Sequence, residues 1–228
     1  MATALAARNI TFMSSLAGRV SNPRLPVGDV RVGGFGGTQG LIDFIRSEQM
    51  THLVDATHPF ARVMSEHAAH ACEATGISLI RLERPGWATR PDAGAWHWAK
   101  DLDDVRAQAE GLGRRPFITS GRQTLHAFAS WTDRDVLVRI VEPLDAPTLP
   151  GWTVIEDRGP YSRTSERALM HAHAIDVLIT KDSGGDHTSA KLDAAAELEI
   201  PVVVLGRPAT AQGATLVTDV AGCLNALR

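Results

Sequence analysis

The chain has 228 residues, more than a common single domain, and its 44% hydrophobic and 21% charged residues are typical of a globular protein. We therefore expect two domains, and the disordered and fibrous classes are excluded. The net charge of −3 gives no general attraction to nucleic acid. No apolar stretch approaches the roughly 20 residues that span a bilayer, and no signal peptide is recognised. With only two cysteines, we expect a cytoplasmic protein that does not bind membranes.

Short apolar runs with strand character alternate with amphipathic stretches along most of the chain. The predicted strands are, in chain order, residues 10–14, 29–32, 52–55, 78–82, 117–119, 136–141, 153–156, 177–180 and 202–205. The predicted helices are residues 41–48, 61–75, 102–111, 123–130, 165–173 and 189–198. This alternation predicts βαβ units, and hence an α/β fold with mainly parallel sheets.

The regular pattern lapses between residues 84 and 100. Proline and glycine interrupt the segment, while Trp87, Trp96 and Trp98 make it too apolar for a free tether. We expect it to pack where two lobes meet, and we place the boundary so that residues 1–98 form one lobe and residues 99–228 the other.

Polar side chains stand directly after the apolar strand at residues 52–55. Asp55, Thr57 and His58 occur there, just before Pro59. In open α/β sheets, ligands bind in the crevice beyond the carboxyl ends of the strands, so these residues are candidates for a site. Alternatively, Thr57 or Asp55 could cap the helix that begins near Pro59.

Two other strand ends in the first half of the chain suit a nucleotide. Ser15, Gly18 and Arg19 follow the strand at residues 10–14. In dinucleotide-binding sheets, an arginine at the end of the second strand suits a 2′-phosphate, which favours NADP over NAD. A solvated surface arginine explains Arg19 equally well.

A glycine-rich segment covers residues 33–37, between a predicted strand and a predicted helix. Gly33, Gly34, Phe35 and Gly36 lie in it. Glycines let backbone amides approach a phosphate, and the start of a helix adds favourable partial charge. The spacing is not that of the standard dinucleotide motif, and a strained turn would need the same glycines.

Two loops in the second half each combine hydroxyls, a glycine and one cation at the start of an expected helix. They contain Thr119, Ser120, Gly121 and Arg122 in one case, and Thr180, Lys181, Asp182 and Ser183 in the other. Amides together with a fixed charge are a common way to bind anions. The alternative is two capped helices with incidental cations.

Several other chemistries lack support in the sequence. No Walker motif and no Gly-x-Ser-x-Gly elbow is present, which argues against ATP hydrolysis and covalent hydrolase chemistry. The closest histidine pairs, His67 with His70 and His171 with His173, lack the spacing of a metal site, so no metal is expected.

Taken together, six segments resemble the precorrin-6A reductase family, in order and over nearly the whole chain. They are residues 15–19, 31–37, 55–60, 82–85, 119–122 and 180–185. The resemblance implies an enzyme of cobalamin (vitamin B12) synthesis that uses NADPH to reduce one double bond of precorrin-6A, giving precorrin-6B. It also implies two Rossmann-like lobes with a cleft between them.

The resemblance further implies roles for individual residues. The first lobe would hold NADPH through Ser15, Gly18, Arg19, Gly33, Gly34, Phe35, Gly36, Asp55, Ala56, Thr57 and His58. The second lobe, with Arg84, would hold the carboxylates of the macrocycle through Thr119, Ser120, Gly121, Arg122, Arg163, Thr180, Lys181 and Ser183. His58 and Tyr161 are candidate proton donors. We expect a monomer or a small homo-oligomer.

One departure from the family concerns the first residues. The family usually opens with an apolar strand and Gly-Gly-Thr before its first helix, whereas residues 1–8 here read as the back of that helix. We therefore expect the first strand and its glycine-rich loop to be missing, through an incompletely assigned reading frame or a natural truncation that impairs cofactor binding.

Two other functions are compatible with the sequence. The first is a protein of the same fold that binds a nucleotide or a tetrapyrrole without turning it over. The second is another α/β enzyme that acts on a phosphorylated metabolite, and we rank it last.

Overall fold

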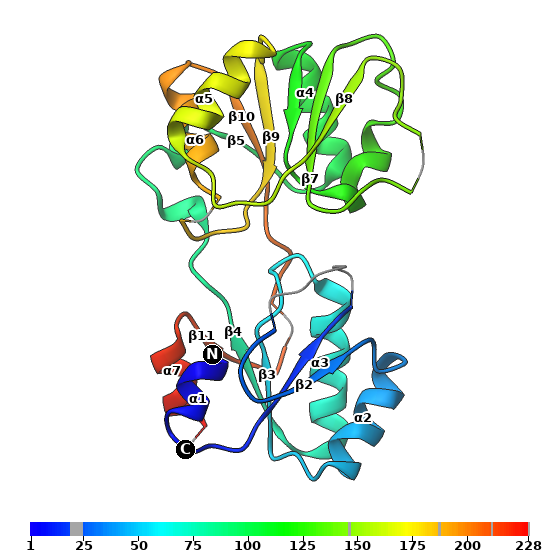
Figure 1. Ribbon diagram of the computed structural model, residues 1–228, viewed down its shortest axis with the longest axis vertical. Helices are drawn as coiled ribbons and strands as arrows, with labels where there is room; N and C mark the ends of the chain where they lie inside the picture. Colours follow the sequence, from blue (N-terminus) through cyan, green and yellow to red (C-terminus); the bar gives the residue numbers. More distant parts are fainter. Residues whose placement is uncertain (19–24, 146, 187, 211, 228) are drawn as a thin grey trace. The chain divides into compact units, whose positions relative to one another are not determined.

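The computed structural model describes residues 1–18, 25–145, 147–186, 188–210 and 212–227. The chain forms two compact units (Figure 1): unit 1 contains Met1–Arg84 and Pro208–Arg228, and unit 2 contains Pro85–Arg207. This division differs from the boundary expected after residue 98. Strand β5 (His97–Ala99) pairs with β10 (Val202–Leu205) in unit 2, and β11 (Thr215–Val217) returns to unit 1, where it pairs with β4 (Ser78–Leu82).

Unit 1 contains two parallel sheets. One consists of β1 (Met13–Leu16) and β2 (Asp29–Val32), and the other has the order β11-β4-β3, with β3 at His52–Asp55. Helices α2 (Gly37–Ser47) and α3 (Arg62–Thr75) pack together on one side, and α1 (Ala2–Ala6) and α7 (Val220–Ala226) lie on the other (Figure 1). The core between α2, α3 and the strands is built from Leu41, Ile42, Ile45 and Ala71.

Unit 2 contains one parallel sheet of six strands, in the order β5-β10-β9-β6-β7-β8. Its remaining strands are β6 (Pro116–Ile118), β7 (Val136–Ile140), β8 (Trp152–Glu156) and β9 (Val177–Lys181). Its helices are α4 (Leu102–Leu112), α5 (Arg163–Ala172) and α6 (Ala190–Glu197), with 3-10 turns η1 (Trp87–Thr89), η2 (Ala93–Ala95) and η3 (Arg122–Phe128). Every residue of β7 and β10 is buried, as expected for inner strands of a sheet with helices on both faces.

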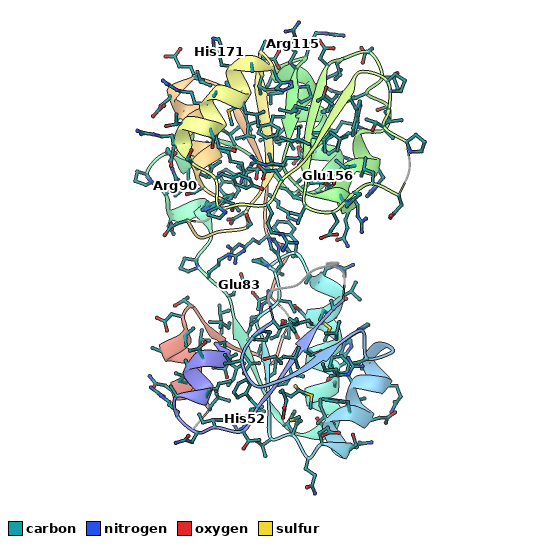
Figure 2. All side chains as sticks on the ribbon, in the orientation of Figure 1. His52, Glu83, Arg90, Arg115, Glu156 and His171 are labelled. Carbon is teal, nitrogen blue, oxygen red and sulfur yellow. The ribbon has the colours of Figure 1, made fainter. Side chains whose placement is uncertain are left out.

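In unit 2, the edge of the sheet at which the strands begin (the amino edge) and the edge at which they end (the carboxyl edge) carry different charged side chains. Arg115 precedes β6 at the amino edge and Glu156 ends β8 at the carboxyl edge, and Figure 2 shows these two side chains at opposite ends of the unit. Because all strands are parallel, the loops that follow them meet at the carboxyl edge.

The prediction of an α/β fold with mainly parallel sheets is confirmed, since all strand pairs in the described residues are parallel. The first predicted strand begins later than expected. The amide of Ile10 closes the turn after α1 by donating to Leu5 O at 3.2 Å, and Asn9 has a positive φ of 53°. The turn that follows α1 therefore reaches Ile10, and the strand begins only at Met13.

The helix expected at residues 123–130 is instead the 3-10 segment η3. Its buried apolar residues, Leu125 and Phe128, are three positions apart, and side chains with that spacing are eclipsed in a 3-10 helix. No helix in the described part of the chain is long and apolar enough to cross a membrane.

Two helical glycines have opposite surroundings, and their substitution by alanine should therefore have opposite effects on stability. A Cβ on Gly40, in α2, would lie 1.7 Å from Phe35 O, whereas one on Gly111, in α4, would have no heavy atom within 4 Å. We expect Gly40→Ala to lower the free energy of unfolding by about 1–3 kcal/mol. Gly111→Ala should raise it by roughly 0.5–1 kcal/mol, because alanine is the better helix former. Urea denaturation of both variants measures these changes, and equal effects would contradict the tight approach at Gly40.

Candidate functional site

The carboxyl end of β3 is organised by the buried carboxylate of Asp55. Its Oδ1 accepts hydrogen bonds from the backbone N–H and the hydroxyl of Thr57, at 3.0 and 2.7 Å. Its Oδ2 accepts one from the Ser65 hydroxyl at 2.6 Å and lies 2.8 Å from the guanidinium of Arg81. The carboxylate therefore fixes the loop that presents Thr57. Neither Asp55 nor Thr57 caps α3, whose N-cap is Ala61 without a side-chain cap.

Arg81, which the sequence analysis missed, connects three side chains beneath this loop. Its guanidinium donates to Glu83 at 3.1 Å and to the Thr57 hydroxyl at 3.1 Å, besides its pair with Asp55. The side chain is 4% exposed, so these pairs lie out of water. The sequence feature that could have identified Arg81 is a charged residue inside an apolar strand, Ser-Leu-Ile-Arg-Leu, because arginine is seldom buried without a partner.

The glycine-rich segment after β2 is held by Arg31. The Arg31 guanidinium donates to Gly33 O at 2.6 Å and to Gly34 O at 2.7 Å, and it lies 4.2 Å from the centre of the Phe35 ring. Helix α2 begins after Gly36, which has a φ of 80° and makes no side-chain cap. The first amides of α2 are therefore left without a capping side chain, an arrangement that suits an anionic ligand.

Space next to these glycines is open. A Cβ on Gly33, Gly34, Gly36 or Gly37 would have no heavy atom within 4 Å. A pocket of about 240 Å³ in unit 1 brings together six of the predicted cofactor residues: Ser15, Gly33, Gly34, Phe35, Asp55 and Thr57. Gly18 lies beside the end of β2, since a Cβ on it would be 3.6 Å from Gly33 N. Gly36, Ala56 and His58 do not line the pocket, and Arg19 lies outside the described residues.

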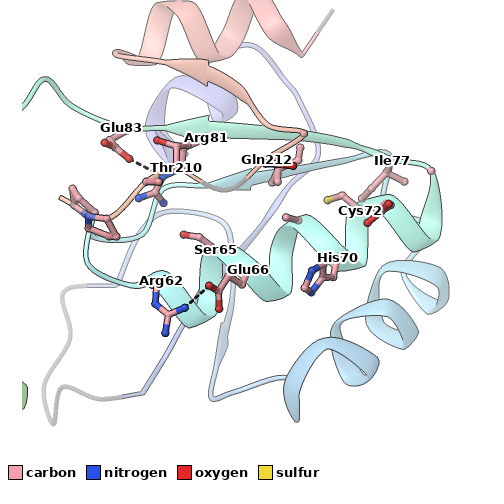
Figure 3. Close-up of a pocket in the computed structure, with 18 residues that line it drawn as sticks. Arg62, Ser65, Glu66, His70, Cys72, Ile77, Arg81, Glu83, Thr210 and Gln212 are labelled. Carbon is pink, nitrogen blue, oxygen red and sulfur yellow. Dashed lines mark hydrogen bonds and ion pairs between the residues drawn. The ribbon is translucent and has the colours of Figure 1, made fainter.

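Unit 1 also has a larger pocket, of about 880 Å³, between α3 and the segment that carries Thr210 and Gln212 (Figure 3). Its wall contains the exposed Arg62–Glu66 pair, at 2.6 Å, and the buried Cys72. Burial raises the pKa of the Cys72 thiol to about 11, so it is not a nucleophile at neutral pH. None of the predicted site residues lines this pocket.

His58 lies on the exposed loop after β3. Its Nδ1 accepts a hydrogen bond from the Phe60 amide at 3.2 Å, and the two rings are 5.8 Å apart. Because Nδ1 accepts, the ring proton of the neutral imidazole is on Nε2.

In unit 2, the loops after β6 and β9 lie side by side at the carboxyl edge. Thr119 donates through both its amide and its hydroxyl to Ile179 O, at 2.8 and 3.0 Å. Gly121 has a φ of 90°, and the Lys181 ammonium lies 3.6 Å from where its Cβ would be. The Ser120 hydroxyl is buried against that of Thr124, at 2.6 Å. The structure thus brings Thr119, Ser120, Gly121 and Lys181 together.

A buried group of charges lies below this edge, and the sequence analysis did not single it out. Arg139 of β7 forms a two-pronged pair with Glu166 of α5, and both side chains are at most 5% exposed. Lys191 of α6 is 3% exposed and donates to Thr188 O at 2.6 Å, with its ammonium 4.9 Å from the centre of a Trp87 ring. No carboxylate of the described residues lies within 4 Å of that ammonium.

The protonation of the two lysines in this group is shifted by their surroundings. Burial, together with the nearby cations Arg139 and Lys181 and against the opposing effect of Glu166, lowers the pKa of Lys191 to about 7. Burial also lowers the pKa of Lys181. Burial therefore favours the neutral forms of both lysines at this edge of unit 2.

Tyr161 borders the same group. The Arg139 guanidinium lies 3.7 Å from the centre of the Tyr161 ring, and the hydroxyl donates to Asp157 O at 2.9 Å. Burial raises the pKa of the phenol, and the Arg139 charge partly offsets this. A raised pKa makes the hydroxyl a weaker acid.

The remaining predicted substrate residues are more dispersed. Arg122 is exposed and donates to Pro143 O at 2.9 Å, and Arg163 is exposed and lies 2.9 Å from Glu197. Thr180 is 1% exposed inside β9, and Ser183 is buried at 3.4 Å from the Thr188 hydroxyl. Arg84 is exposed at the end of the first segment of unit 1. No group of three or more potential metal ligands occurs among the residues that the structure describes.

The lowered pKa of Lys191 makes stability depend on pH in a defined direction. The unfolded state holds a proton on this lysine up to about pH 10.5, whereas the folded state releases it near pH 7, so folding becomes more favourable as pH rises through this window. From pH 7 to pH 9, this group should add about 2 kcal/mol to the free energy of unfolding. Lys191→Met should lack that increment in urea denaturation, and parallel pH profiles for the two proteins would contradict the assignment.

Comparison with known proteins adds to this geometry. The family model described as "Precorrin-6x reductase CbiJ/CobK" matches residues 1–228. A protein of Rhodococcus erythropolis named "Precorrin-6A reductase" is 47% identical over 94% of this chain and 86% of its own length. One from Mycobacterium tuberculosis with the same name is 44% identical over 93% and 86%.

More distant relatives and a solved structure agree with these matches. A protein of Salmonella typhimurium named "Cobalt-precorrin-6A reductase" is 28% identical over 74% of this chain and 67% of its own length. The structure titled "CobK precorrin-6A reductase" superposes with a TM-score of 0.89 and 33% identity, covering 99% of this chain and 90% of its own. The chain therefore belongs to the CbiJ/CobK family of precorrin-6x reductases.

Proposed function

We propose that the protein reduces precorrin-6A to precorrin-6B in cobalamin synthesis, with NADPH as the hydride donor. Its membership of the precorrin-6x reductase family supports the reaction. The structural observation that carries the proposal is the position of the Lys181 ammonium beside the backbone of Gly121 at the carboxyl edge of unit 2, because the substrate implied by the family is a polycarboxylate. The cytoplasmic location and the oligomeric state remain predictions from the sequence.

Several features of unit 1 support the proposal that this unit binds the dinucleotide. The open glycines after β2 and the uncapped start of α2 suit a diphosphate, and the Thr57 loop stands at the other wall of the same pocket. The Asp55 carboxylate already accepts three hydrogen bonds, from Thr57 and Ser65, and pairs with Arg81. We therefore assign it the role of holding Thr57 in place. Arg19 remains the proposed partner of a 2′-phosphate.

Several features of unit 2 support the proposal that this unit binds the macrocycle. Lys181 and the amides around Gly121 lie together at the carboxyl edge, where a carboxylate would gain charge-assisted hydrogen bonds. The Arg139–Glu166 pair and Lys191 lie behind them and are buried. A carboxylate bound at this edge would pair with the Lys181 ammonium.

Reduction of a carbon–carbon double bond requires one hydride and one proton. NADPH supplies the hydride when it is bound. The imidazolium form of His58 and the Tyr161 hydroxyl are the candidate proton donors, and the raised pKa of Tyr161 makes the phenol the weaker acid of the two. If His58→Ala leaves turnover unchanged at saturating NADPH, His58 is not the donor.

We assign the cobalt-free macrocycle as the substrate. The relatives named "Precorrin-6A reductase" reach 47% and 44% identity, whereas those named "Cobalt-precorrin-6A reductase" reach 30% and 28%.

A mixing experiment tests the reaction. With precorrin-6A present, the protein should consume NADPH with loss of the nicotinamide absorbance band and formation of precorrin-6B. Lys181→Met should raise the KM for precorrin-6A by roughly 10-fold or more, since a hydrogen bond to a charged group contributes about 1.5–3 kcal/mol. Arg115→Met, which removes an exposed cation at the opposite edge of the sheet, is the matched control. A shifted macrocycle spectrum without loss of NADPH would indicate a binding protein and contradict the proposal.

A further inference from the structure

The loop that follows β9 is held in place by the buried residue Asp182. Its Oδ1 accepts a hydrogen bond from the backbone N–H of Trp87 at 2.8 Å, and its Oδ2 lies 3.3 Å from the Nε of Arg207. The same Nε donates to the backbone oxygen of Asp182 at 3.0 Å. The amide of Asp182 donates to Leu205 O at 2.9 Å, which extends the pairing of β9 with β10 by one residue. Asp182 is therefore fixed through its backbone and through its side chain.

The two partners of this carboxylate lie close to the points at which the chain enters and leaves unit 2. Pro85 is the first residue of this unit and Arg207 is the last. Trp87 is buried in the core of the unit, and its indole N–H donates at 3.0 Å to Gly185 O, at the far end of the same loop. The loop after β9 is thus tied at two positions, Asp182 and Gly185, to a buried part of unit 2.

Two glycines allow this close approach. A Cβ on Gly86 would lie 2.5 Å from the Oδ2 atom of Asp182. One on Gly184 would lie 2.2 Å from Arg207 Nη2 and 2.3 Å from Pro85 O. Gly184 also has a φ of 65°, in the left-handed region that favours glycine. The loop therefore packs against these segments with no room for a side chain at either glycine.

The orientation of Asp182 affects that of Lys181. Adjacent side chains of an extended strand point to opposite sides, and Lys181 is the last residue of β9. While the Asp182 carboxylate contacts Trp87, the Lys181 ammonium lies 3.6 Å from the Cβ position of Gly121 on the neighbouring loop. An ammonium that is already in place binds a carboxylate more tightly than a mobile one, because ordering a long side chain on binding lowers the affinity.

We propose that Asp182 is a positioning residue for the macrocycle, which fixes the loop after β9 so that Lys181 stands ready at the carboxyl edge. Asp182 does not bind the substrate itself. Its carboxylate oxygens are used by Trp87 and Arg207, and its charge would repel a carboxylate of the ligand. This inference rests on the proposed function of unit 2 and adds to it a residue that acts through Lys181.

Two alanine substitutions separate positioning from a purely structural role. Asp182→Ala removes the carboxylate at the carboxyl edge. Asp176→Ala is the matched control, because the Asp176 carboxylate accepts the backbone N–H groups of Arg114 and Arg115, at 2.9 and 2.7 Å, at the amino edge of the same sheet. Both variants should unfold at lower urea concentration. Only Asp182→Ala should raise the Kd for precorrin-6A, by about tenfold or more in a titration followed by macrocycle absorbance, and both should keep the KM for NADPH.

A conservative variant and a measurement without substrate complete the test. Asp182→Asn keeps an oxygen that accepts from the Trp87 N–H but loses the charge beside Arg207. Its Kd for precorrin-6A should rise about threefold or more, yet less than that of Asp182→Ala. In the protein without ligand, the Trp87 amide should exchange its hydrogen about tenfold faster in Asp182→Ala than in the wild type, measured by NMR.

Each outcome has a defined meaning. Unchanged exchange at Trp87 would overturn the proposed hold on the loop. Faster exchange with an unchanged Kd, or an equal rise of the Kd in Asp176→Ala, would overturn positioning and leave a structural role. If Asp182→Ala does not fold, a wild-type Kd in Asp182→Asn overturns the proposal. If the wild type binds precorrin-6A without consuming NADPH, the proposed reaction fails while the Kd values still decide the role of Asp182, and no binding at all would overturn both.

Discussion

Parallel pairing brings the carboxyl ends of neighbouring strands to the same edge of a sheet, and every strand pair in the described residues is parallel. The loops after β1, β2 and β3 therefore meet in unit 1, and those after β6 and β9 meet in unit 2. Local contacts then set the shape of each loop. Asp55 fixes the loop of Thr57, and Arg31 holds the carbonyls of the glycine-rich segment so that its amides are available.

The two units treat buried charge differently. In unit 1, the buried guanidinium of Arg81 is paired with the carboxylates of Asp55 and Glu83, and this network stiffens the loop that carries Thr57. In unit 2, Arg139, Lys181 and Lys191 lie near one another and near Glu166. These cationic side chains support placing the carboxylates of the macrocycle in unit 2. The open glycines and the uncapped start of α2 support placing the cofactor diphosphate in unit 1.

Much of the fold follows from local sequence pattern, and the remainder depends on contacts between distant segments. Strands at His52–Asp55 and Ser78–Leu82 have the predicted bounds, because each is an apolar run with a clear end. Strands β5 and β11 were missed: each has three residues and is fixed only by pairing with a strand far away in the sequence. These two pairings also decide the division into units. At the site, glycines and hydroxyls could be predicted as motifs, whereas Arg81, Arg139 and Lys191 stand in apolar elements and acquire their significance only from burial.

The central claim is that the cofactor binds unit 1 and the macrocycle binds unit 2. Its most direct test is amide NMR of the labelled full chain, titrated separately with NADPH and with precorrin-6A. NADPH should shift the amides of Gly33, Gly34, Gly36 and Thr57 and leave those of Thr119 and Gly121 unchanged, and precorrin-6A should shift those of Thr119, Gly121 and Lys181. Shifts from NADPH confined to unit 2 would contradict the account.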